Sequence, residues 1–277
     1  MGAASSITIS MNLSSAMFSQ LFGTSLFSFV TLLVVAAASG FVGAFALMRR
    51  MALASDAVSH IALPGLGIAL LLKIHPLVGA AAALVVGVLL VWFAERRTSI
   101  ATETVIGVVF SASLAIGALL TPEEELLEVL FGGFRTLSTL EAFIGLGIAL
   151  LVIGAVFFLK DRFTLALVSP DIARTVGLNV ARLDLVFLFI FAAAVLLGLE
   201  FLGVLLTGAL IIVPAAAAKN IASDLSSDFM FAMCIAMGSV AVGIVLASAF
   251  GVVASPVIIS VAAAAFIVSV FARRETP

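Results

Sequence analysis

Long apolar runs, each bounded by charged residues or by proline and glycine, alternate with short polar breaks along most of the chain. A run of about 20 apolar residues is long enough to cross a bilayer as an α-helix. The pattern therefore predicts an all-α, polytopic membrane bundle of about nine transmembrane helices, with eight as the alternative count. The predicted spans are 25–48, 51–73, 76–94, 101–120, 139–160, 183–199, 200–218, 228–250 and 254–272. The boundary between 183–199 and 200–218 is the weakest, because only Gly198-Leu199-Glu200 separates them.

Composition excludes the main soluble classes. Hydrophobic residues make up 64% of the 277 residues and charged residues 10%, whereas soluble domains have about 45–50% and about 25%. Disorder, collagen and a secreted disulfide scaffold are excluded, the last because Cys234 is the only cysteine. The net charge of −2, with no basic run longer than two residues, argues against nucleic-acid binding. We expect one membrane domain over 25–272, a tail or interfacial segment over 1–24 that is not a signal peptide, and a short tail over 273–277.

Basic residues predict the orientation, since Lys and Arg accumulate in cytoplasmic loops. When Arg49 and Arg50 are placed inside, every other basic residue except Lys73 and Arg135 also falls inside. The N-terminus is then outside and the C-terminus inside.

The second predicted span carries a carboxylate and an imidazole on one helical face. Asp56 and His60 are four residues apart, which places them one above the other on an α-helix. A charged residue near the middle of a membrane costs about 2.5–3.5 kcal/mol on insertion scales, so we expect a compensating function. Ser59 lies on the neighbouring stripe, from which it can hydrogen-bond either residue.

Proline and glycine follow this pair. Pro64 lacks the N–H that would bond the carbonyl of His60, and Gly65 loosens the helix further, so a bend and a freed carbonyl are expected there. Carboxylate, imidazole and carbonyl groups together suit a divalent transition metal such as zinc or manganese. Pro214 frees a carbonyl in a later span in the same way, which marks a possible pathway helix.

Two other interpretations of the Asp56–His60 pair stay open at this point. The two side chains can pair only with each other and hold the helix in place. They can also form a proton relay, for which Glu103 and Glu200 are the remaining titratable partners in the spans.

A punctuated segment, SPDIARTVGLN at 169–179, lies between two spans on the predicted inner side. Ser169 suits an N-cap, Pro170 the first helical position, Asp171 the positive end of the helix dipole, and Gly177 the C-terminal stop. We predict a cytoplasmic helix of about two turns that serves as a rigid docking element.

Signatures of enzymes are missing from the sequence. It contains no GxxxxGK[ST], so the chain is not its own P-loop ATPase, and neither HExxH nor GxSxG occurs. An enzymatic function is therefore not expected.

Several blocks together resemble one family, the permeases of zinc/manganese/iron ABC importers. The blocks are RRMALASDAVSHIALPG (49–65), TETVIGVVFSASLAIG (102–117), VLFGGF (129–134), SPDIARTVGLN (169–179) and FLGVLLTGALIIVPAAAA (201–218), in the order in which the family has them. One departure is Ser55, where the family usually has glycine. The resemblance implies a type II ABC-importer fold in a prokaryotic cell membrane.

The resemblance also implies roles and partners. Asp56 and His60 would line the route of a zinc, manganese or iron ion, the transported substrate, with no permanently bound cofactor. Residues 169–179, with Ser169, Pro170, Asp171, Arg174 and Gly177, would form the coupling helix on a separate cytoplasmic P-loop ATPase. A second permease copy and an extracytoplasmic metal-binding protein would complete the transporter.

Alternative functions remain at this stage. An ion- or proton-coupled secondary transporter of metal ions also uses broken helices near mid-membrane. A membrane scaffold with a purely structural Asp56–His60 pair is a further alternative. A contribution of Glu200, His75 or the acidic loop 123–128 to metal capture is left open.

Overall fold

The computed structural model describes residues 26–51, 54–98, 102–120 and 139–272, and every regular element in these ranges is an α-helix. The helices are α2 (Leu26–Met48), α3 (Ala54–Leu72), α4 (Pro76–Arg97), α5 (Thr102–Leu120), α7 (Thr139–Val168), α8 (Pro170–Thr175), α9 (Val180–Leu202), α10 (Val204–Ile221), α11 (Leu225–Phe250) and α12 (Ala254–Phe271). In this part of the chain, 9 helices are long and apolar enough to cross a membrane, and α8 is not among them. The predicted all-α bundle of about nine spans is confirmed.

Several predicted boundaries were wrong by a few residues. Helix α7 continues to Val168 instead of ending at 160, α9 begins at Val180 instead of 183, and α11 begins at Leu225 instead of 228. The charged triplet Lys160-Asp161-Arg162 ends the apolar run but not the helix. Charges mark where a helix leaves the membrane, and the helix itself can continue into water.

The separation between α9 and α10 lies at Gly203, beyond the predicted break after Leu199. Gly203 has φ 87°, a conformation that only glycine adopts without strain. Its carbonyl accepts hydrogen bonds from the Thr207 N–H at 3.1 Å and the Thr207 hydroxyl at 2.7 Å, which begin α10. Glu200 therefore belongs to the last turn of α9.

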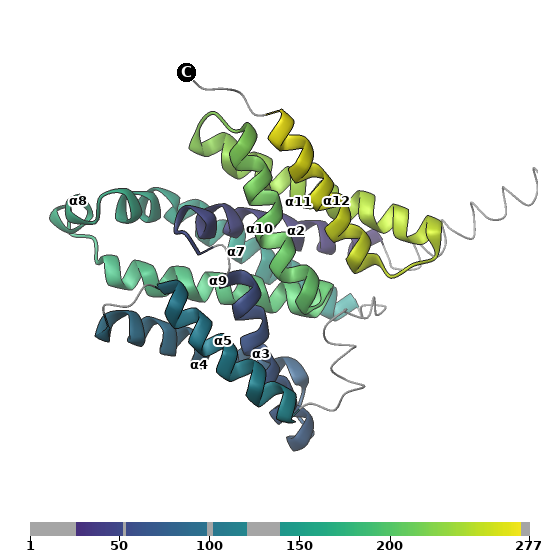
Figure 1. Ribbon diagram of the computed structural model, residues 1–277, viewed down its shortest axis with the longest axis horizontal. Coiled ribbons are helices and arrows are strands. Elements are labelled where there is room, and N and C mark those ends of the chain that lie inside the picture. The colour runs from purple at the N-terminus through teal and green to yellow at the C-terminus, as the bar shows by residue number, and fades with distance from the viewer. Residues whose placement is uncertain (1–25, 52–53, 99–101, 121–138, 273–277) are drawn as a thin grey trace, which may run out of the picture.

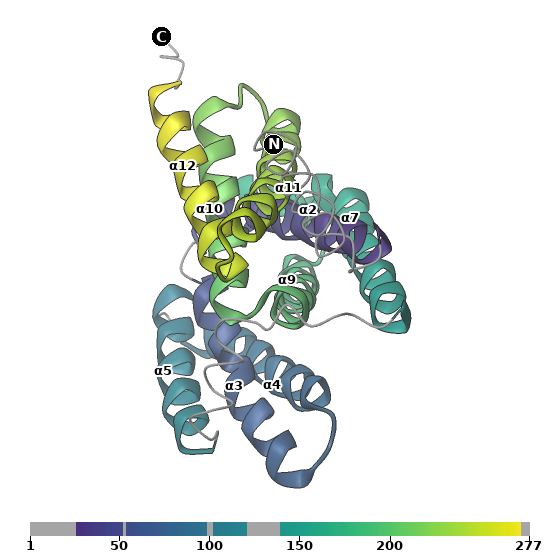
Figure 2. The same cartoon turned by 90° about the vertical axis from the view of Figure 1, so that its right-hand side faces the viewer.

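The helices form three groups (Figures 1 and 2). α2 and α9 run through the middle of the molecule with α7 packed against them at one edge, α3, α4 and α5 lie on one side, and α10, α11 and α12 lie on the other. Helix α10 packs against both α2 and α3. It therefore joins the central helices to the group of α3, α4 and α5, which carries Asp56. The most enclosed spans are α2 and α9, whereas α5 and α12 leave most of their surface uncovered.

Aromatic side chains fill the centre of the bundle. Phe45 of α2 stacks on Phe229 of α11, with ring centroids 4.6 Å apart, and meets Phe163 of α7 edge-on at 5.9 Å. Phe163 in turn contacts Phe187 of α9 at 5.7 Å. Offset and edge-to-face rings of this kind pack densely, so four helices are joined at one apolar centre.

Small residues allow the closest helix approaches. A Cβ added to Gly43 of α2 would overlap the carbonyl oxygen of Ile211 in α10. Gly65 of α3 and Gly79 of α4 face each other in the same way, each against the carbonyl oxygen of the other. In a membrane, such contacts replace the hydrophobic driving force that lipid cannot supply between helices.

Candidate functional site

The first turn of α3 lies inside the bundle, against α10. The hydroxyl of Ser55, fully buried, donates to the carbonyl of Gly208 at 3.3 Å. A Cβ on Gly208 would lie 3.1 Å from both the Cα and the Oδ1 of Asp56. Gly43 of α2 contacts α10 only three residues further on, at Ile211. The start of α3 is therefore at the level where α2 crosses α10, and Asp56 lies within the membrane-spanning part of the bundle.

Asp56 and His60 come together as the spacing predicts. The His60 Nε2 is 3.8 Å from the Asp56 Oδ1, which is too long for a hydrogen bond. The Asp56 side chain is 55% exposed and that of His60 is 15% exposed. The His60 Nδ1 is buried and has no hydrogen-bond partner. The pair is thus close but not locked to itself.

This arrangement has the chemistry of a partial metal site. A carboxylate oxygen and an imidazole nitrogen are common ligands of zinc and manganese. No group of three or more His, Cys, Asp or Glu that could hold a metal occurs among the described residues. From that part of the chain, one copy supplies two such ligands, fewer than the four of a closed structural zinc site.

Other predicted residues of this region have different roles. The predicted hydrogen bond from Ser59 to Asp56 or His60 is not formed. The buried Ser59 hydroxyl instead donates to the Ser55 carbonyl at 2.7 Å. Helix α3 continues through Pro64 to Leu72, and α10 continues through Pro214, so neither proline ends its helix. Helix α5 packs on this point, where a Cβ on Gly117 would lie 3.4 Å from the Pro64 nitrogen. The expected bend stays a prediction.

The segment 169–179 contains a short helix, α8, of 6 residues, close to the predicted length of about two turns. Pro170 is its first residue, Asp171 lies in its first turn, and Gly177 follows it with φ 83°, as predicted. Ser169 occupies the N-cap position, but its side chain makes no capping hydrogen bond, so its predicted capping role was wrong. Arg174 pairs with Asp171 at 2.9 Å on the exposed face, where an ion pair contributes little stability.

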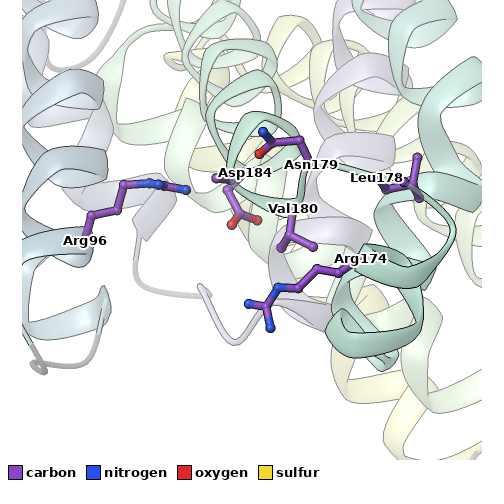
Figure 3. Close-up of a pocket in the computed structure, with 8 residues that line it drawn as sticks. Arg96, Arg174, Leu178, Asn179, Val180 and Asp184 are labelled. Carbon is purple, nitrogen blue, oxygen red and sulfur yellow. The ribbon is translucent and has the colours of Figure 1, made fainter.

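A groove of about 610 Å³ lies beside α8 (Figure 3). It lies between the end of α4 and the segment that joins α8 to α9, and is lined by Arg96, Arg174, Gly177, Leu178, Asn179, Val180, Ala181 and Asp184. Arg96 and Arg174 extend from opposite sides in this view, with Asp184 between them.

The remaining open candidates have different positions. His75 is exposed at the start of α4 and caps no helix through its side chain. Loop residues 123–128 lie outside the described residues.

Comparison with known proteins defines the class. The helical bundle superposes on a chain of PsaBC from Streptococcus pneumoniae in complex with Fab, with TM-score 0.79 and 24% identity, over 92% of this chain and 94% of that one, so the two chains share a fold. The sequence matches the ABC 3 transport family over residues 22–273, so the chain belongs to that family. It is a multi-pass protein of the bacterial cell membrane.

Curated relatives support the same assignment. The chain is 29% identical to the manganese transport system membrane protein MntC of Listeria innocua, over 89% of this chain and 90% of the relative. It is 26% identical to the high-affinity zinc uptake system membrane protein ZnuB of Haemophilus influenzae, over 84% and 91%. The predicted family resemblance is confirmed.

Two features of this region were not found from the sequence. The contact between Gly208 and Asp56 is one of them, because nothing in a chain rich in glycine and alanine indicates which glycine lies against Asp56. Arg49 was assigned to orientation alone, although the structure pairs it with Asp184. Long-range contacts of this kind leave no local pattern.

Proposed function

We propose that this chain is the permease subunit of an ATP-driven importer that moves divalent transition-metal ions across the cell membrane by alternating access. The observation that carries the proposal is the Asp56–His60 pair, half-open, intramembrane and with an unpartnered imidazole nitrogen. The names of the relatives support manganese and zinc as the first ions to test. Iron is the third ion to test, and only the family resemblance supports it.

A homodimer would complete the ion site. The Asp56 side chain is 55% exposed, which leaves it accessible to an ion and to a second copy across a narrow aqueous route. Two copies would supply two carboxylates and two imidazoles, a donor set sufficient for four-coordinate zinc.

The energy would come from a partner. The chain has no P-loop motif, and the groove beside α8 offers a place for a separate cytoplasmic ATPase. An extracytoplasmic binding protein would release the ion at the opposite face. ATP-driven closure of the ATPase pair would move α8 and open the route alternately to each side.

In this mechanism the two side chains act in sequence on the ion. The Asp56 carboxylate compensates the double charge as the ion loses water in the membrane interior. The neutral imidazole of His60 then adds a softer ligand that selects transition metals over calcium and magnesium. With few ligands from each copy, the ion binds weakly enough to leave when the route opens inward.

Uptake of radioactive manganese and zinc into cells tests the proposal. Asp56→Asn and His60→Ala should each lower uptake about tenfold or more at matched expression, since each removes a ligand. Asp161→Asn is the matched control, because it removes an exposed carboxylate of α7 that has no role in the ion site, and its uptake should equal the wild type. Unchanged uptake in Asp56→Asn would contradict the proposal.

A second measurement separates the ABC importer from a secondary transporter. The purified chain in liposomes should move no metal in response to an ion gradient. Adding the ATPase, the binding protein and ATP should start import. Gradient-driven transport by the chain alone would favour the secondary transporter instead.

A further inference from the structure

Arg49, at the end of α2, is paired with a residue far away in the chain. Its Nη2 donates to the Oδ1 of Asp184 in α9. The guanidinium also lies over the fully buried ring of Phe187, with Cζ 4.6 Å from the centroid. Only 19% of the Arg49 side chain is exposed. A guanidinium held by a carboxylate and an aromatic face has a defined position, unlike an arginine in an open surface pair.

On one side, the pair leads to α8 and the groove. Asp184 lines the groove together with Arg174 of α8. The connection from α8 to α9 is hydrogen-bonded, with the Leu178 N–H donating to the Ala173 carbonyl at 2.9 Å and the Gly177 N–H to the Arg174 carbonyl at 3.0 Å. Ala173 is fully buried. A displacement of α8 therefore reaches the start of α9 without a loose loop between them.

On the other side, the pair leads to the candidate ion site. The chain turns directly after Arg49: Arg50 has φ 59°, and the Met51 N–H donates to the Ala46 carbonyl at 2.9 Å. Met51 is 4% exposed, so this turn is anchored in the core. Helix α3 begins three residues later at Ala54, and its first turn carries Asp56 against Gly208.

We propose that the Arg49–Asp184 pair is the link that transmits movement of α8 in the groove to Asp56 and His60. This inference rests on the proposed function, because it assigns the route by which a docked ATPase changes the ion site. Arg49 and Asp184 are positioning residues, and neither touches the ion. The competing explanation is a passive staple between α2 and α9, which would affect stability and not coupling.

The experiment measures metal ions imported per ATP hydrolysed by the complete transporter in liposomes, with its ATPase and binding protein. Asp184→Asn, which keeps the side-chain shape and removes the charge, should lower this ratio about tenfold, within the range typical of coupling between sites. ATP hydrolysis itself should continue. Arg49→Gln should have the same effect, and the exchanged double variant Arg49→Asp/Asp184→Arg should recover part of the ratio.

Arg162→Gln is the matched control. Like Arg49→Gln, it removes a positive charge on the predicted inner side, but Arg162 is exposed. Its ratio should equal that of the wild type. A wild-type ratio in Asp184→Asn overturns the inference, and so does a parallel fall of import and hydrolysis. Failure of both single variants to assemble identifies a staple and also overturns it. If the wild-type transporter imports no metal with ATP, the proposed function fails instead.

Discussion

Two carboxylates in membrane-spanning helices have opposite surroundings. The Asp56 side chain in α3 is 55% exposed, and its Oδ1 lies 3.8 Å from the Nε2 of His60. The Asp228 side chain in α11 is 4% exposed, and its Oδ2 lies 3.7 Å from the Nζ of Lys219 in α10. The chain therefore encloses one charge and leaves the other open. An enclosed, paired charge indicates a structural role, whereas an open one indicates a partner from outside the chain.

The roles of the two sites should separate by stability as well as by uptake. Asp56→Asn, expected to lower uptake strongly, should leave the melting temperature in detergent unchanged or raise it, because an open functional charge adds little to folding. Asp228→Asn should leave uptake within about twofold of the wild type, as expected for a residue outside the ion route. Thermal unfolding and uptake measured on the same preparations check this. A large fall in the melting temperature of Asp56→Asn would show that Asp56 has a structural role, like the enclosed Asp228.

Removing either partner of the Asp228–Lys219 pair should lower the free energy of unfolding, but by different amounts. Lys219→Met leaves the buried Asp228 carboxylate without a compensating charge, and one of its oxygens, Oδ1, already lacks a partner. We expect a loss of about 1–3 kcal/mol in the free energy of unfolding. Asp228→Asn should cost less, because the Lys219 side chain is 60% exposed and can turn to water. Lys160→Met, whose ammonium lies over Phe157, is the control for removing a lysine.

Metal binding at Asp56 should depend on Gly208, the glycine of α10 that packs against it. In Gly208→Ala the new Cβ would lie 3.1 Å from the Asp56 Cα and Oδ1, so α3 or the carboxylate must shift. We expect apparent metal affinity in the uptake assay to fall about tenfold, the lower end for groups that orient a ligand. Gly238→Ala, with nothing within 4 Å of the added Cβ, is the matched control. Equal uptake in both variants would show that Asp56 adapts freely.

The smallest effect concerns the start of α11, close to the enclosed pair in sequence. Asp224 caps this helix: its carboxylate accepts from the Ser227 hydroxyl at 2.6 Å and the Ser226 N–H at 3.2 Å. The Ser227 hydroxyl is the main cause that holds the pKa of Asp224 below its ordinary 3.8. A lowered pKa stabilises the fold above the ordinary value, and this contribution disappears as pH falls through the lowered one.

The melting temperatures of wild type and Ser227→Ala should therefore differ slightly near neutral pH. The difference should shrink as the pH falls below about 4, where an ordinary aspartate protonates. A difference that grows on acidification would contradict the capping role. Ser248→Ala, at an exposed position later in the same helix, is the control.

The helical positions could be predicted because bilayer insertion is governed by local composition. The prediction failed where charged residues did not mark the end of a helix, because α7 continues past Lys160 and Asp161. The break before α10 was placed too early because Gly198 and Gly203 are equally plausible stops in the sequence. Gly198 instead packs against Thr207, and Gly203 takes the positive φ.

The sequence by itself determined the membrane class, the approximate number of spans and the juxtaposition of Asp56 and His60. Hydrophobic transfer and the helical period depend only on neighbouring residues. The tertiary structure alone decided that Asp56 stays open while Asp228 is enclosed, that Gly208 lies behind Asp56, and that Arg49 reaches Asp184. These contacts join helices distant in the chain, and their packing follows from the shapes of many side chains together.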